Sequence, residues 1–246
     1  MRIDIWSDIV CPFCYVGKRN LEQALAEFEH RDEVEVVWHS FELDPSATEH
    51  PAGSLPEMIA GKYQMSLEQA IASQESLAER AREVGLDFNW RQARYGNTFD
   101  AHRVIHYAAE QGLASAAQEA FKKAYFTQGR SVQDHESILD IASEIGLDTA
   151  EVEAVLKSDR YAADVRADEQ LARQLGINGV PFFLIESKWA VSGAQPAKML
   201  VQALRQVWEE THRVEFLNPL AGAAGDAAGN NAAEAGPSCD MNGNCS

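Results

Sequence analysis

Two cysteines separated by two residues stand near the start of the chain, where a strand is expected to give way to a helix. Cys11 and Cys14 follow the largely apolar segment 3–6 and open an amphipathic stretch that continues to Phe28. A Cys-x-x-Cys pair at such a junction is the layout of a thiol–disulfide redox site. Unpaired N–H groups and the positive end of the helix dipole would stabilise a thiolate at this position. The spacing therefore predicts an exposed nucleophile of low pKa at Cys11 and a resolving thiol at Cys14.

A second pair, Cys239 and Cys245, lies near the C-terminus and accounts for the remaining cysteines. A turn signal between the two would allow a disulfide to close. On a flexible linker of about 25 residues the pair would reach roughly 25–30 Å. It could therefore exchange disulfides with Cys11 and Cys14 as a relay within the chain. A passive tail whose thiols oxidise slowly is the other interpretation.

The four cysteines together could instead hold zinc, but the spacing argues against a metal. Structural zinc sites prefer about two to four residues between paired ligands, and the second pair encloses five. His102 and His106 would share a helix face, yet Arg103 stands where a metal-binding helix would carry Glu. We therefore expect no metal site, and packing or substrate contact for the two histidines.

The elements that must position the first cysteine pair lie at the two ends of the chain. Apolar periodicity predicts strands over 2–7, 34–43, 181–186 and 189–193, and helices over 12–29, 163–175 and 196–210. Pro12 suits a first helical turn, where its missing N–H costs nothing. Neither α/β end can bury two sheet faces alone, so the two ends must pack together.

Residues 55–161 show helical periodicity throughout and no strand candidate, which predicts about four helices. Residues 221–238 are mostly Ala, Gly and Asn, a composition typical of a flexible linker. We therefore expect an α/β fold with a large all-helical insertion domain and a flexible C-terminal tail. The expected parts are a sheet domain from 1–53 and 162–212, an insertion domain over 54–161, and a tail over 213–246.

Composition restricts the partners. The formal net charge is −17, with 38 acidic and 21 basic residues, which argues against nucleic-acid binding because phosphate contact needs a basic surface. The sequence has no apolar run of about 18 residues for a membrane span and no signal-peptide pattern. We expect a cytoplasmic protein, and in that compartment a close cysteine pair is more often catalytic or metal-binding than structural.

Several short motifs together resemble the DsbA-like thioredoxin superfamily, in particular its FrnE-type branch. The motifs are SDIVCPFCYVG at 7–17, FELDP at 41–45, NT at 97–98, AHR at 101–103, GVPFF at 179–183 and SGAQ at 192–195. They spread over residues 1–210 in the order that the family uses. The resemblance implies a thioredoxin fold with a helical insertion.

The resemblance also assigns site residues. It implies a catalytic role for Pro181 and a cis bond before it, opposite the cysteine pair. The residue pattern alone leaves that bond open, because a trans proline that begins an edge strand is the ordinary case. A cis bond could leave the Val180 backbone free to pair with a substrate chain. The residues expected to bind the substrate are Pro12, Phe13, Val180, Asn97, Thr98 and His102.

We therefore expect a thiol–disulfide oxidoreductase or isomerase that acts on protein or small-molecule disulfides and thiols. Beyond its redox-active disulfides no cofactor is expected, although glutathione could serve as a co-substrate. Phe13 stands where strongly oxidising periplasmic members carry His, which favours reduction or isomerisation over net disulfide formation. One alternative is a glutathione-dependent isomerase or transferase of the 2-hydroxychromene-2-carboxylate isomerase type, whose members generally have Ser in place of Cys11. A chaperone that works without redox chemistry is the other.

Overall fold

The computed structural model describes residues 1–48 and 53–213 of the 246-residue chain. Residues Met1–Trp208 form one compact unit. Cys239 and Cys245 lie outside the described residues, so the relay stays a prediction and the zinc alternative stays untested. None of the described helices combines the length and the apolar character needed to span a membrane.

A four-stranded sheet joins the two ends of the chain in the strand order β2-β1-β3-β4. The strands are β1 (Arg2–Ser7), β2 (Glu35–Ser40), β3 (Phe182–Ile185) and β4 (Trp189–Ser192). β1 pairs in parallel with β2 and antiparallel with β3, and β3 pairs antiparallel with β4. The expected packing of the two α/β ends is confirmed. β2 ends earlier than predicted, because the N–H of Leu43 turns away to donate to the Asp8 carboxylate at 2.7 Å.

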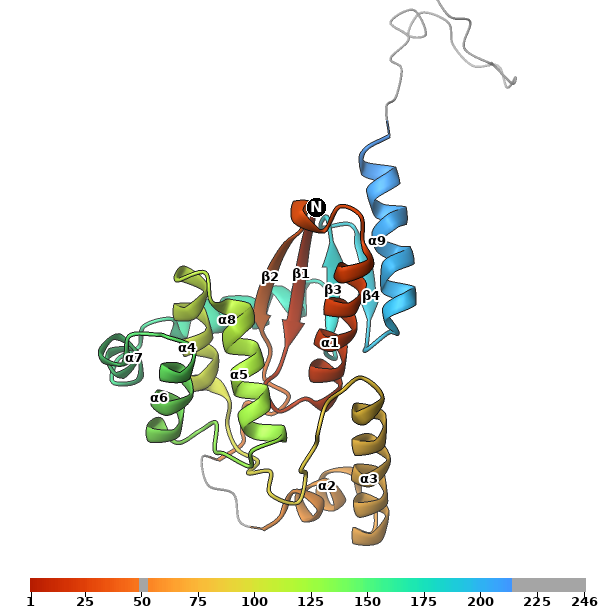
Figure 1. Cartoon of the computed structure of the whole chain (residues 1–246). Coiled ribbons are helices and arrows are strands. Elements are labelled where there is room, and N and C mark those ends of the chain that lie inside the picture. Colours follow the sequence, from red (N-terminus) through yellow and green to blue (C-terminus); the bar gives the residue numbers. More distant parts are fainter. Residues whose placement is uncertain (49–52, 214–246) are drawn as a thin grey trace, which may run out of the picture. The chain divides into compact units, whose positions relative to one another are not determined.

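Helices cover both faces of the sheet, as Figure 1 shows. They are α1 (Pro12–Glu27), α8 (Ala162–Gln174) and α9 (Ala197–Thr211), with a short 3-10 turn, η1 (Arg31–Glu33), after α1. Alternation along β1 directs Ile3 and Ile5 into a core with α1 and α9. Trp6 points to the opposite face and packs with Ala172 of α8. The strand after which the cysteines follow is thus buried on both faces.

Six helices stand between β2 and α8 in the described residues, more than the sequence predicts. They are α2 (Leu55–Tyr63), α3 (Leu67–Glu83), α4 (Phe99–Glu110), α5 (Ala114–Phe126), α6 (His135–Glu144) and α7 (Thr149–Leu156). Local capping signals divide the pattern: Ser66 and Gln69 form a capping box that begins α3, and the Asp148 side chain caps α7. The absence of strands from the described part of this block is confirmed, whereas its boundaries as a separate domain stay a prediction.

The core of the helical block reaches the start of α1. Ile9 and Tyr15 are buried in the same cluster as Phe88 and Phe126. The Tyr15 ring centroid lies 5.9 Å from that of each phenylalanine. The turn that carries the cysteines is therefore held between the sheet and the helical block.

Candidate active site

Cys11 and Cys14 lie at the first turn of α1, directly after β1. Cys11 precedes the helix, and its carbonyl accepts the N–H groups of Cys14 at 3.1 Å and Tyr15 at 3.3 Å. Pro12 begins the helix, as predicted. Both cysteines are free thiols. The local geometry is thus the one that the Cys-x-x-Cys spacing predicts.

The burial of the thiols differs from the prediction. Cys11 is 3% exposed and Cys14 is 1% exposed, whereas an exposed Cys11 is expected for a nucleophile. The Cys11 sulfur lies 3.6 Å from the carbonyl oxygen of Val180. The loop before β3 therefore covers the first thiol, a contact between residues from opposite ends of the chain.

The two thiols share a hydrogen bond and titrate as a pair. Donation to Cys14, together with burial, raises the pKa of the Cys11 thiol well above its ordinary value. Burial also opposes ionisation of Cys14. The hydrogen bond from Cys11 and the positive charge of Lys122 outweigh it, and the pKa of Cys14 falls below its ordinary value. In this closed arrangement the first negative charge belongs to Cys14, the reverse of the predicted low pKa at Cys11.

The loop that faces the cysteines carries the cis bond that the resemblance implies. The peptide between Val180 and Pro181 is cis. A Cβ added at Gly17 would lie 2.8 Å from Cγ of Pro181, so α1 approaches this loop about as closely as a glycine permits. The part that Pro181 plays in docking a substrate stays a prediction.

An apolar cavity of about 440 Å³ lies beside Cys11, between the cysteine turn and helices α2 and α3. The expected substrate-binding residues that line it are Pro12, Phe13 and Val180. Cys14 does not line it. Three of its apolar side chains remain partly in contact with solvent: Phe13 is 45% exposed, Leu43 is 41% and Tyr63 is 63%. A substrate that enters the cavity would therefore meet Cys11 first.

The other expected substrate-binding residues lie elsewhere. Asn97 lines a second, more polar cavity of about 560 Å³, and its amide nitrogen lies 3.3 Å from a Glu42 carboxylate oxygen. Thr98 and His102 are 3% and 0% exposed, and both face the buried Asp8. Neither side chain lines either of these two cavities, and the part that Thr98 and His102 play in substrate binding stays a prediction.

Buried charged side chains gather behind the cysteines, a feature that the sequence analysis does not identify. Asp8 is 1% exposed; burial opposes its ionisation, but the hydrogen bond and charge of His102 lower its pKa. Lys122 on α5 is 0% exposed, and burial lowers its pKa to about 8. Lys122 stands three residues before the buried Tyr125, on the core stripe of its helix. A lysine on the core-facing stripe of a helix could have identified this group from the sequence, because lysine is almost never fully buried without a partner.

The two histidines of α4 do not converge on one site. His102 lies 3.4 Å from Asp8, whereas His106 lies 3.1 Å from the Ser40 hydroxyl and 3.2 Å from Asp168. Across residues 1–48 and 53–213, no three His, Cys, Asp or Glu side chains are placed to hold a metal ion together. The chemistry available at the described site is that of two thiols and the charges behind them.

The chain is similar to known proteins over most of its length. Residues 2–205 match the model of the DSBA-like thioredoxin domain family. The crystal structure of a probable DsbA oxidoreductase, SCO1869 from Streptomyces coelicolor, is 43% identical with a TM-score of 0.83, covering 100% of this chain and 98% of that chain. The uncharacterized protein YwbO of Bacillus subtilis (strain 168) is 28% identical over 187 residues, or 75% of this chain and 86% of YwbO. The structure of 2-hydroxychromene-2-carboxylate isomerase has a TM-score of 0.66 at 16% identity, with 86% and 98% of the chains covered, and shows likeness of fold alone.

Proposed function

The chain belongs to the DsbA-like thioredoxin domain family, and from this we propose that it is a thiol–disulfide oxidoreductase or isomerase that works through Cys11 and Cys14. One observation carries the proposal: two free thiols stand at the start of α1, one on the wall of an apolar cavity and the other behind it. This order separates the thiol that meets the substrate from the thiol that resolves the intermediate. The more specific FrnE-type assignment is part of the proposal.

Cys11 makes the first bond because it lines the cavity and Cys14 does not. The reduced pair loses one proton, and the remaining proton lies between the two sulfurs. When that proton moves to Cys14, the Cys11 thiolate attacks one sulfur of a substrate disulfide. The substrate S–S bond breaks, a mixed disulfide forms at Cys11, and the departing thiolate takes up a proton from water.

Cys14 completes the exchange. It loses its proton, and its thiolate attacks the Cys11 sulfur, breaking the mixed disulfide and releasing the second substrate thiol. The substrate gains two electrons, and the protein is left with a Cys11–Cys14 disulfide. A thiol such as glutathione would then return the protein to its dithiol form. In isomerisation the substrate's own thiol performs the release, and no net electrons move.

The surroundings of Cys11 support reduction or isomerisation in a reducing compartment, which we propose to be the cytoplasm. Phe13, the exposed residue between the cysteines, offers the thiolate neither a hydrogen-bond donor nor a positive charge. The thiolate therefore lacks one stabilising influence that a strong oxidant would need. The proposed substrates are protein or small-molecule disulfides that place an apolar group in the cavity, with Val180 and Pro181 beside the reacting sulfur.

Reduction of insulin disulfides tests the proposal. We expect Cys11→Ser to abolish turnover, and Cys14→Ser to accumulate mixed disulfides that mass spectrometry detects. The reduction potential of the pair, measured in glutathione buffers, should lie in the range of about −270 to −180 mV typical of reductases and isomerases. A Cys11→Ser protein that retained full activity would refute the assignment.

The exposed part of the cavity supports a second candidate, a chaperone that binds unfolded chains without redox chemistry. Phe13, Leu43 and Tyr63 present apolar surface beside Cys11. Suppression of aggregation that survives the double substitution Cys11→Ser/Cys14→Ser would establish this activity. Its loss in the double variant would assign aggregation suppression to the thiols. The isomerase alternative has likeness of fold in its favour, and the Cys-x-x-Cys pair of Cys11 and Cys14 against it.

A further inference from the structure

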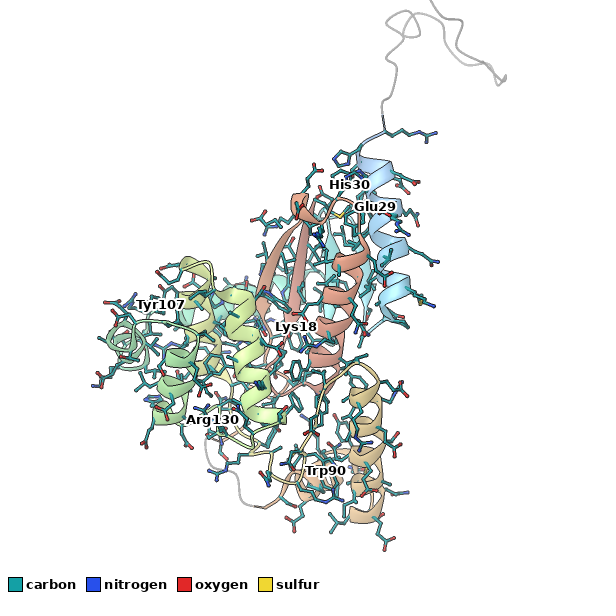
Figure 2. All side chains as sticks on the ribbon, viewed as in Figure 1. Lys18, Glu29, His30, Trp90, Tyr107 and Arg130 are labelled. Atoms are coloured by element: carbon teal, nitrogen blue, oxygen red, sulfur yellow. The ribbon has the colours of Figure 1, made fainter. Side chains whose placement is uncertain are left out.

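Helix α5 packs one face against α1, just beyond the cysteine turn. The Glu119 carboxylate of α5 accepts hydrogen bonds from Tyr15 at 2.7 Å, Lys18 at 2.6 Å and Arg19 at 2.9 Å. Figure 2 labels Lys18 on α1, on the side where α5 runs. Two helical turns further along, Phe126 packs against the Tyr15 ring. The face of α5 that carries both contacts therefore lies against the start of α1.

Lys122 lies on this face, three residues after Glu119 and four before Phe126. Its side chain is 0% exposed. Within the described part of the chain its hydrogen-bond partner is the amide oxygen of Gln118, a neutral group. A buried ammonium without a carboxylate partner is costly, so its position calls for another negative group.

Four ionisable groups act on Lys122 from the elements around it. Cys11 and Cys14 do so from the start of α1, Asp8 from the loop after β1, and Lys18 from the following turn of α1. Lys18 is already paired, at 2.5 Å from Glu22 and 2.6 Å from Glu119. Asp8 is bonded to His102 and to the N–H of Leu43. Asp8 therefore divides its charge between these partners and Lys122, whereas the cation that acts on the thiolate of Cys14 is Lys122.

We propose that Lys122 is a positioning residue whose ammonium holds Cys14 as a thiolate in the reduced protein. The inference rests on the proposed function, in which Cys14 resolves the mixed disulfide at Cys11. Lys122 lowers the cost of removing the Cys14 proton, and the thiolate then forms its bond to the Cys11 sulfur as the substrate thiolate departs. When the disulfide has formed, the negative charge on Cys14 is gone, and the acidic group that still acts on Lys122 is Asp8.

Titration of the thiolate by its ultraviolet absorbance tests the proposal directly. The experiment uses the full chain with Cys239→Ser and Cys245→Ser, so that only the first pair contributes thiolate. In Lys122→Met the first thiolate transition should move upward by about one pH unit or more, as expected when an adjacent charge is removed. Resolution of a Cys11 mixed disulfide with a small aromatic disulfide, followed below the transition, should slow by about tenfold for each pH unit that the transition moves. A transition and a resolution rate that both stay unchanged would overturn the proposal.

Lys123→Met is the matched control, because it removes the same charge from an exposed position of the same helix. We expect it to leave the titration and the resolution rate unchanged, and an equal shift in this variant would overturn the proposal by making the effect one of net charge. A second measurement needs no substitution at position 122. Because the interaction is reciprocal, the pKa of the Lys122 amine, followed by NMR, should fall when the pair is oxidised. An amine whose pKa stays constant on oxidation would also overturn the proposal.

Failure of this inference and failure of the proposed function give different results. Insulin reduction by the parent protein, with an unchanged thiolate titration in Lys122→Met, would overturn only the role of Lys122. A shifted titration in a parent protein that reduces no disulfide would support the pairing of Lys122 with Cys14 and refute the oxidoreductase function.

Discussion

Two clusters of buried or half-buried ionisable groups differ in how completely they are paired. The first, here the paired cluster, comprises Asp4, His39, His106 and Asp168. The second, here the cysteine cluster, comprises Asp8, Cys11, Cys14, His102 and Lys122. His39 lies 2.6 Å from Asp168 and 2.8 Å from Asp4, so both its ring nitrogens are bonded. In the cysteine cluster Lys122 is bonded to an amide, and Nδ1 of His102 has no partner within the described residues.

This difference in pairing indicates a structural role for the paired cluster and a chemical role for the cysteine cluster. In the paired cluster, burial opposes ionisation of His39 and Asp168, but their hydrogen bonds raise the pKa of His39 and lower that of Asp168 to about 2. The ion pairs and hydrogen bonds of these side chains link β2 to α4 and α8. In the cysteine cluster the charge of Lys122 has no carboxylate partner among the described residues and acts on the Cys14 sulfur. Buried groups with shifted pKa values and incomplete pairing are typical of functional sites.

The paired cluster should carry the larger share of stability. We expect Asp168→Asn to lower the free energy of unfolding by about 3 kcal/mol, because it removes the carboxylate that His39 and His106 share and leaves His39 with Asp4 alone. Denaturant unfolding measures the loss. The thiolate titration of the cysteines should stay as in the parent protein, and a large shift there would show that the two clusters act as one.

The pH dependence of the free energy of unfolding should also come from the paired cluster. The pKa of Asp168 is lowered on folding, so its contribution is present above its ordinary value of 3.8 and is lost as the pH falls through about 2. The expected loss is about 2 kcal/mol. The pKa of His39 is raised, so its contribution is present below 6.5 and is lost as the pH rises through the raised value. Unfolding measured from acid to neutral pH should show both slopes, and Asp168→Asn should flatten them.

Substitution in the cysteine cluster should change the free energy of unfolding in the opposite direction. We expect Lys122→Met to raise the free energy of unfolding of the oxidised protein at neutral pH by about 1–2 kcal/mol, because in that form it removes a buried charge that has neither a carboxylate nor a thiolate partner. The folded pKa of Lys122 is about 8 against an ordinary 10.5. The unfolded chain therefore binds more protons between these values, and stability gains from this group as the pH rises through them. Destabilisation of the oxidised protein by Lys122→Met would show that the lysine has a structural role and would contradict this expectation.

The smallest effect is expected where packing alone shapes the cysteine site. In Gly17→Ala, helix propensity favours alanine by about 0.5–1 kcal/mol, whereas the 2.8 Å approach to Pro181 adds an overpacking cost of about 1–3 kcal/mol. We expect a net loss of about 1 kcal/mol in thermal or denaturant unfolding. Insulin reduction should fall by more than this stability change explains, because the Val180 carbonyl would move away from Cys11. Unchanged turnover would show that the site tolerates this displacement.

Much of the fold follows from local patterns. The alternation of residues 2–7, the helix that begins at Pro12 and the strand-free block after β2 all agree with the structure. The fold of a DsbA-like thioredoxin domain follows from motifs that are each continuous in sequence. Capping signals at Ser66 and Asp148 were also readable, and they would have raised the predicted number of helices.

Only the tertiary structure decided the environment of the thiols. Burial of Cys11 depends on Val180, which lies 169 residues away in the chain. The contact that places α5 against α1 joins Lys18 to Glu119 across 101 residues, and it brings Lys122 behind Cys14. The sequence by itself determined which atoms can react, because residue type and short spacing set the chemistry of the cysteine pair. Which sulfur holds the charge was decided by packing, because burial and electrostatic fields come from segments that only folding brings together.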